Sequence, residues 1–136
     1  MRLVLIDTSA IYAIAVKADR NHARAVAFAR RWLSGRAAFI LPDWVFVETM
    51  TLLKARFGSE PAERVGAELR QNPAYRWMAV TPEDERESWA AFQKYSDKAW
   101  SYTDCAILVL AQRLHLKDVF AFDKHFSQMP GIVRRP

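Results

Sequence analysis

The sequence predicts an α/β fold with three layers, α/β/α, around a mostly parallel central sheet. Short apolar segments alternate with longer stretches of helical character along the whole chain. Strands that are separated by helices form parallel sheets covered on both faces. The chain has 136 residues, of which 51% are hydrophobic, and it contains no linker, repeat or low-complexity segment. We therefore expect a single domain over residues 1–136.

The first half of the chain begins with the apolar strand 3–6, and helix boundaries follow from local signals. Asn21 is a possible cap for the second helix, which stops at Gly35. Pro42 and Asp43 open a third helix, and Gly58 suits its C-terminal cap. The elements expected here are strands 3–6 and 38–41 and helices 8–16, 22–34 and 43–56.

The second half contains two clear helix starts. Thr81 and Asp84 have the spacing of a capping box, and so do Ser101 and Asp104. Pro61 is expected to start a helix that Asn72 and Pro73 end. The remaining elements expected here are helices 82–96 and 102–114, strands 76–80, 119–122 and one near 132–133, and a turn around His125.

Four acidic residues each stand where an apolar segment gives way to a helix or a turn. Asp7 and Asp123 follow predicted strands, Glu48 lies in an apolar helical stretch, and Asp104 lies in a first helical turn. The carboxyl edge of an open α/β sheet is where ligands bind. We therefore predict that the four acids form one catalytic metal site. Hard oxygen ligands favour Mg²⁺ or Mn²⁺ over zinc.

Each acid also has a purely structural interpretation. Asp104 could be the last member of a capping box, and Asp7 could form an Asx turn after its strand. Asp123 could belong to a plain turn. Glu48 is harder to explain in this way, because an unpaired charge in an apolar helix is costly.

Other side chains near these acids could bind substrate. Ser9, Ser101 and Trp100 are candidate substrate-binding residues, because hydroxyls contact phosphates and an aromatic ring can stack on an unpaired base. The same serines could instead cap helices, and Trp100 could belong to the core. Lone histidines at helix starts and turns usually make local hydrogen bonds, so neither His22 nor His125 is assigned a role in acid–base catalysis.

Composition and charge limit the class of protein. The formal net charge is +5, and it would be +9 for the rest of the chain if four acids were gathered in one site. Such a surface attracts phosphate backbones. The absence of a long apolar run and of a signal-peptide pattern predicts a cytoplasmic protein with no membrane partner. The single cysteine, Cys105, is interpreted as a small buried side chain. The basic residues cluster in an early group and at the tail: Arg20, Arg24, Arg30, Arg31 and Arg36, then Arg134 and Arg135.

The ordered motifs resemble those of the PIN-domain ribonucleases, and most closely the VapC-type toxins of toxin–antitoxin pairs. The motifs are Asp7-Thr8-Ser9, Pro42 followed by Glu48, Ser101-x-x-Asp104-Cys105, and Phe122-Asp123-Lys124-His125-Phe126, with Asn21-His22 before the second helix. Such proteins often have Thr or Ser two residues before the last acid, where this chain has Ala121.

The resemblance implies a metal-dependent endoribonuclease that hydrolyses phosphodiester bonds in RNA. It also implies a cognate antitoxin and a homodimer. A noncatalytic RNA-binding or partner-binding module with the same fold is the alternative. A haloacid-dehalogenase-like phosphatase is disfavoured, because it needs a second Asp where Ser9 stands. A phosphoacceptor receiver domain is disfavoured, because Thr81 and Pro82 follow the middle strand.

Overall fold

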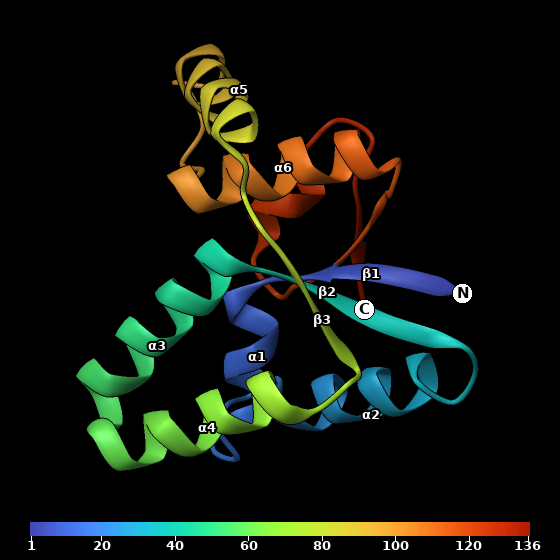
Figure 1. Ribbon diagram of the computed structural model, residues 1–136, viewed down its shortest axis with the longest axis vertical. Coiled ribbons are helices and arrows are strands. Elements are labelled where there is room, and N and C mark those ends of the chain that lie inside the picture. The colour runs from blue at the N-terminus through green and yellow to red at the C-terminus, as the bar shows by residue number, and fades with distance from the viewer.

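The computed structural model describes all 136 residues and contains a five-stranded sheet between helical layers (Figure 1). The strands lie in the order β3-β2-β1-β4-β5, and every neighbouring pair is parallel. The predicted α/β class is therefore confirmed, with a sheet that is parallel throughout. The strands are β1 (Arg2–Ile6), β2 (Ala37–Pro42), β3 (Tyr75–Met78), β4 (Asp118–Phe120) and β5 (Val133–Arg135).

Six α-helices and one short 3₁₀ helix complete the fold. Figure 1 shows α5 and α6 on one side of the sheet and α1, α2 and α4 on the other, with α3 leading away from the end of β2 to pack beside α4. The three-layer prediction is confirmed. The helices are α1 (Thr8–Ala15), α2 (His22–Trp32), α3 (Asp43–Phe57), α4 (Ser59–Gln71), α5 (Pro82–Lys94), α6 (Tyr102–Leu114) and η1 (Lys124–Gln128).

The core forms where the sheet meets its two helical layers. Strand residues Val4, Leu5 and Ile6 are fully buried, because helices cover both faces of a parallel sheet. Helix α6 is buried over the eight residues from Asp104 to Ala111, since it packs against the sheet on one side and α5 on the other. Cys105 is buried in this helix, as predicted.

Several element boundaries differ from the sequence-based prediction. Strand β3 ends at Met78, and the Val80 N–H instead donates to the Asp43 carboxylate at 3.0 Å. Helix α4 begins at Ser59 and takes Pro61 into its first turn, where a missing N–H costs nothing. Asn21 occupies the N-cap position of α2, but its side chain makes no capping bond.

The order in which strands are added to the sheet changes direction at β1, so β1 and β4 are neighbours at a topological switch point. The segments that follow β1 build β2 and β3 on one side of it, whereas β4 and β5 lie on the other side. Crevices at the carboxyl ends of strands form at such switch points. Asp7 follows β1 here, and its N–H donates to the Phe120 carbonyl at the end of β4. None of the helices combines the length and the apolar character that a membrane crossing requires.

Candidate metal centre

The structure brings the four predicted acids together at one cleft with a volume of about 390 Å³. Asp7 caps α1 directly after β1, Glu48 projects from α3, and Asp104 lies in the first turn of α6. Asp123 caps η1, three residues beyond the end of β4. Four segments that are far apart in the sequence therefore supply carboxylates to one cleft.

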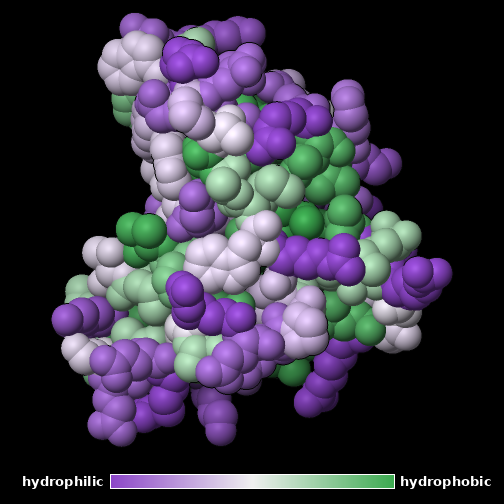
Figure 2. Space-filling model, viewed as in Figure 1, coloured by the Kyte–Doolittle hydropathy of each residue, from purple (hydrophilic) through white to green (hydrophobic).

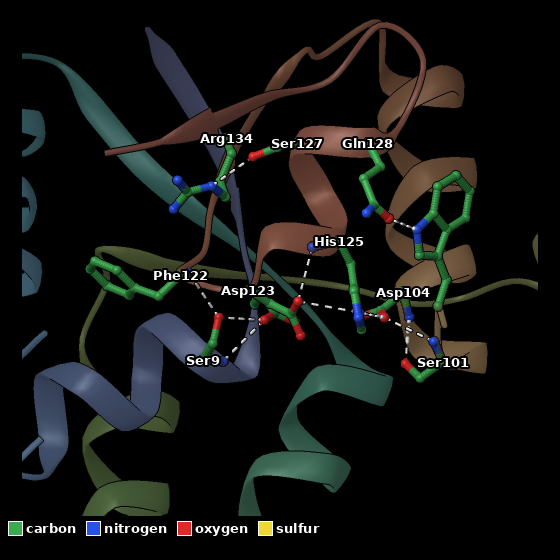
Figure 3. Close-up of polar contacts among 11 residues, drawn as sticks. Ser9, Ser101, Asp104, Phe122, Asp123, His125, Ser127, Gln128 and Arg134 are labelled. Atoms are coloured by element: carbon green, nitrogen blue, oxygen red, sulfur yellow. Dashed lines mark hydrogen bonds and ion pairs between the residues drawn. The ribbon is translucent and has the colours of Figure 1, made fainter. Parts of the chain in front are cut away.

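Asp7 is buried and held by Ser9. One oxygen of Asp7, Oδ2, accepts from the Ser9 N–H at 3.1 Å and from the Ser9 hydroxyl at 2.6 Å. The Ser9 hydroxyl oxygen also accepts from the Phe122 N–H at 3.0 Å, so this side chain ties α1 to the segment before Asp123 (Figure 3). The pKa of Asp7 is raised to about 7: burial raises it most, the Ser9 hydrogen bonds partly offset this, and the charges of Asp104 and Glu48 add to the rise.

Asp104 forms the predicted capping box with Ser101. Its Oδ2 accepts from the Ser101 N–H at 2.8 Å, and its own N–H donates to the Ser101 hydroxyl at 3.0 Å. Burial raises the pKa of Asp104, hydrogen bonds from Ser101 and His125 lower it, and the nearby charge of Asp123 raises it. The structural interpretation of Asp104 is therefore correct, and it leaves the second oxygen, Oδ1, without a hydrogen bond.

His125 stands between two of the acids, which the sequence did not reveal. Its Nδ1 lies 3.1 Å from Asp104 Oδ2 and 3.2 Å from Asp123 Oδ1 (Figure 3). These three side chains could hold one cation, since their ligand atoms all lie within 4.8 Å of one another. The only hint in the sequence was the short segment Asp-Lys-His. A turn that begins at Asp123 places the His125 side chain beside Asp104 and Asp123.

The donor set fits a hard divalent cation. Asp7 and Asp104 make their hydrogen bonds through Oδ2 and Asp123 through Oδ1, so each keeps one oxygen with no hydrogen bond. The half-buried Glu48 carboxylate makes no hydrogen bond at all, so both of its oxygens remain open. Oxygen donors dominate, with His125 as the one nitrogen, which suits Mg²⁺ or Mn²⁺ better than zinc.

The three candidate substrate-binding residues have different surroundings. Ser9 and Ser101 line the cleft, although both hydroxyls also organise an acid. Trp100 is only 4% exposed, its indole N–H donates to Gln128 at 3.0 Å, and its ring packs on Tyr95. This burial matches the alternative interpretation of Trp100 as a core residue and leaves little ring surface on which a base could stack.

The predicted basic surround is divided between two regions. Arg24, on the first turn of α2, lies over the Phe122 ring at 5.5 Å, and Phe122 lines the acidic cleft. Arg31, near the other end of α2, instead lines a separate cavity with Arg2. The expected basic tail lies in β5, where Arg134 donates to Ser127 and to the Ala121 carbonyl, and Arg135 pairs with Asp118.

Comparisons with known proteins identify the family and the fold of the chain. A family model described as the PIN domain matches residues 4–132. The chain belongs to the PIN-domain family. It is similar to a solved structure of the Mycobacterium tuberculosis toxin VapC20, described as cleaving the sarcin–ricin loop, at 26% identity over 98% of this chain and 99% of that chain, with a TM-score of 0.85. No curated protein sequence matches the chain.

Two more distant structures show the same fold. FitAcB from Neisseria gonorrhoeae is 16% identical over 98% of this chain and 96% of that chain, with a TM-score of 0.71. VapBC2 from Rickettsia felis, bound to a DNA fragment from its promoter, is 8% identical over 98% and 97%, with a TM-score of 0.69. The resemblance of this PIN domain to VapC-type toxins, inferred from its motifs, is confirmed by the family match and by the similarity to VapC20.

Proposed function

We propose that this PIN domain is a divalent-metal-dependent endoribonuclease and the toxin of a toxin–antitoxin pair. The observation that carries the proposal is that four acids line one cleft and that each has at least one carboxylate oxygen without a hydrogen bond. The acids are Asp7, Glu48, Asp104 and Asp123. Family membership and the similarity to an RNA-cleaving VapC support the same activity.

The chain's own residues prepare the site for a cation and a phosphodiester. Ser9 orients Asp7, while Ser101 and His125 fix the orientation of Asp104. Asp7, with its pKa of about 7, releases its proton near neutral pH and then presents a charged oxygen. A bound Mg²⁺ or Mn²⁺ would lower the pKa of its water and neutralise charge at the leaving oxygen.

The proposal is tested by incubating purified protein with total cellular RNA and mapping the new 5′ ends. Cleavage should require Mg²⁺ or Mn²⁺ and stop in chelator. Asp104→Asn should lower the rate by at least about a hundredfold, while Asp123→Asn should retain more activity because Asp123 is more exposed than Asp104. Glu63→Gln, an exposed α4 acid remote from the cleft residues, is the matched control.

Two outcomes would reject the proposal of a metal-dependent nuclease that acts through these four acids. Cleavage that persists in chelator would show that the activity does not require a divalent metal ion. Equal and small losses at all four cleft acids would mean that they only support the fold. RNA binding without cleavage, in the presence of either metal, would favour the noncatalytic RNA-binding alternative.

A cognate antitoxin is the protein partner that we propose, because toxin–antitoxin complexes are among the structures with this fold. A second copy of the chain is the other partner. The edge strand β3 is open on one side, and large apolar side chains are exposed on this strand and on helices α3 and α5: Trp77 at 40%, Val47 at 62% and Trp89 at 52%. Figure 2 shows apolar residues across the middle of this face, between more polar regions above and below.

Self-association through this surface can be tested by sedimentation. The parent should sediment as a dimer, and Trp77→Asp should shift it toward monomer, because a charge opposes burial of the apolar face. A parent that is monomeric at all concentrations would reject the homodimer.

A further inference from the structure

Arg56 lines the acidic cleft, although the sequence analysis assigned it no functional role. Glu48, Leu52 and Arg56 all line the cleft and follow one another at intervals of four residues on α3. Residues at this spacing share a helix face. Eight residues of helix correspond to about 12 Å along the axis, so the base of Arg56 is well separated from that of Glu48.

The Arg56 guanidinium is held in place without a carboxylate partner. Its Nη1 donates to the Tyr12 hydroxyl at 3.0 Å, and its central carbon lies 5.3 Å from the centre of the Tyr12 ring. Tyr12 in turn contacts the Phe57 ring, with 6.2 Å between centroids. Arg56 forms no ion pair, although five acids line the same cleft: Asp7, Asp19, Glu48, Asp104 and Asp123.

This arrangement leaves most of the donors of Arg56 open to a ligand. A guanidinium has five N–H donors in a planar fork that matches the oxygens of a phosphate. The side chain is exposed, so a phosphate can reach it from solvent. The same cleft is lined by five acids, which repel a polyanion unless cations are bound. One fixed positive charge at the rim therefore has a direct use in retaining a nucleic-acid strand.

We propose that Arg56, oriented by Tyr12, binds a backbone phosphate of the RNA strand next to the phosphodiester that is cut. This inference rests on the proposed ribonuclease function and adds a phosphate-binding site to it. Because the base of Arg56 lies about 12 Å from that of Glu48 along α3, its phosphate is a neighbour of the reacting one. Arg56 is thus a substrate-binding residue, and Tyr12 is a positioning residue.

The test measures RNA affinity against salt with variants made in an Asp104→Asn background, so that the strand is not cut. The probe is a fluorescein-labelled pool of single-stranded oligoribonucleotides of random sequence, followed by anisotropy in Mg²⁺. Arg56→Gln should weaken binding about fivefold and lower the salt slope by about one. Tyr12→Phe should give a smaller loss of affinity with the salt slope retained. Arg64→Gln, an exposed arginine on α4 that pairs with Glu60, is the control and should match the parent.

Kinetic constants and melting temperatures distinguish phosphate binding by Arg56 from a purely structural role. They also allow this inference to fail independently of the nuclease proposal. Arg56→Gln in the otherwise unmodified protein should raise KM with little change in kcat, and metal should raise its melting temperature as much as it does for the parent. Equal salt slopes for parent and Arg56→Gln, with RNA cleavage intact, would overturn the Arg56 site alone. A parent that neither binds nor cuts RNA would overturn the proposed function and this site together.

Discussion

Three carboxylates in the cleft serve the fold and the site at the same time. Asp7 caps α1 through Oδ2, Asp104 completes a capping box through Oδ2, and Asp123 accepts the His125 N–H through Oδ1. Each bond fixes the orientation of the carboxyl group and so aims the other oxygen. The structural and the metal-binding interpretations of these acids are therefore compatible. A test of either interpretation has to separate loss of a cap from loss of a ligand.

Asp7 allows this separation through pH. Because burial raises its folded-state pKa from 3.8 to about 7, the charged form destabilises the folded protein. The stability that this group contributes is fully present below about pH 4, is lost as pH rises toward 7, and stays lost above it. We expect metal-free Asp7→Asn to be more stable than the parent at about pH 8, by up to about 4 kcal/mol at 1.36 kcal/mol per pKa unit. The difference should shrink toward zero near pH 4.

The measurement is urea unfolding at a series of pH values in chelator. The Asn side-chain oxygen can still accept from the Ser9 N–H and hydroxyl, so the cap is preserved. Lower stability of Asp7→Asn than of the parent at about pH 8 would contradict the pKa argument.

The order and type of nearly every helix and strand could be predicted from the sequence. The buried runs of β1 and β2 and the two capping boxes were readable because their signals are local. The predicted boundaries were wrong where a residue distant in the sequence determines them. The strand predicted to reach Val80 ends at Met78, because the Val80 N–H donates to the Asp43 carboxylate.

The site was predictable to a similar extent. Three of the acids could be placed because each stands at a local boundary, and the topology of a parallel sheet brings such boundaries to one edge. Glu48 could be placed because its charge is unusual in an apolar helical stretch. The roles of Trp100 and His125 depend on contacts 21 or more residues apart in the chain, with Gln128 and Asp104 respectively. No pattern in the neighbouring sequence encodes those contacts.

Helices α5 and α6 are joined by an ion pair between the buried carboxylate of Asp84 and the exposed side chain of Arg113, which can be tested on its own. Asp84 is 1% exposed; Arg113 donates to its two oxygens at 2.8 and 2.9 Å, and the Thr81 N–H donates at 3.0 Å. Burial raises the pKa of Asp84, but the bonds from Arg113 and Thr81 outweigh this and hold the pKa below its ordinary value.

Loss of Asp84 should therefore strongly destabilise the protein. We expect Asp84→Ala to lose about 3 kcal/mol at neutral pH, because Arg113 and the first turn of α5 lose their partner. The contribution is present above the ordinary carboxyl pKa and disappears as pH falls through the lowered folded-state value. Glu87→Ala, an exposed residue on the same helix, is the control for chemical denaturation. Similar losses for both variants would contradict the role given to the ion pair.

The whole molecule separates its charges. It carries a formal +5, yet the cleft collects five carboxylates, and the exposed arginines of α2 are distributed from the cleft to the opposite edge of the sheet. Carboxylates about 5 Å apart repel by roughly 3 kcal/mol per pair at an effective dielectric near 20. The metal-free fold therefore contains a repulsion that a cation would remove.

This repulsion predicts how metal changes the stability of the whole chain. Millimolar Mg²⁺ or Mn²⁺ should raise the melting temperature, because an ion that binds only the folded state stabilises it by about 2.7 kcal/mol at a hundred times its Kd. The rise should be larger at about pH 8 than at about pH 5, since Asp7, with a pKa of about 7, must lose its proton before it can bind the ion. Asp104→Asn should gain less from metal than the parent, and the α4 control Glu63→Gln should gain as much. A melting temperature that metal leaves unchanged at both pH values would show that the cleft acids do not form a metal site.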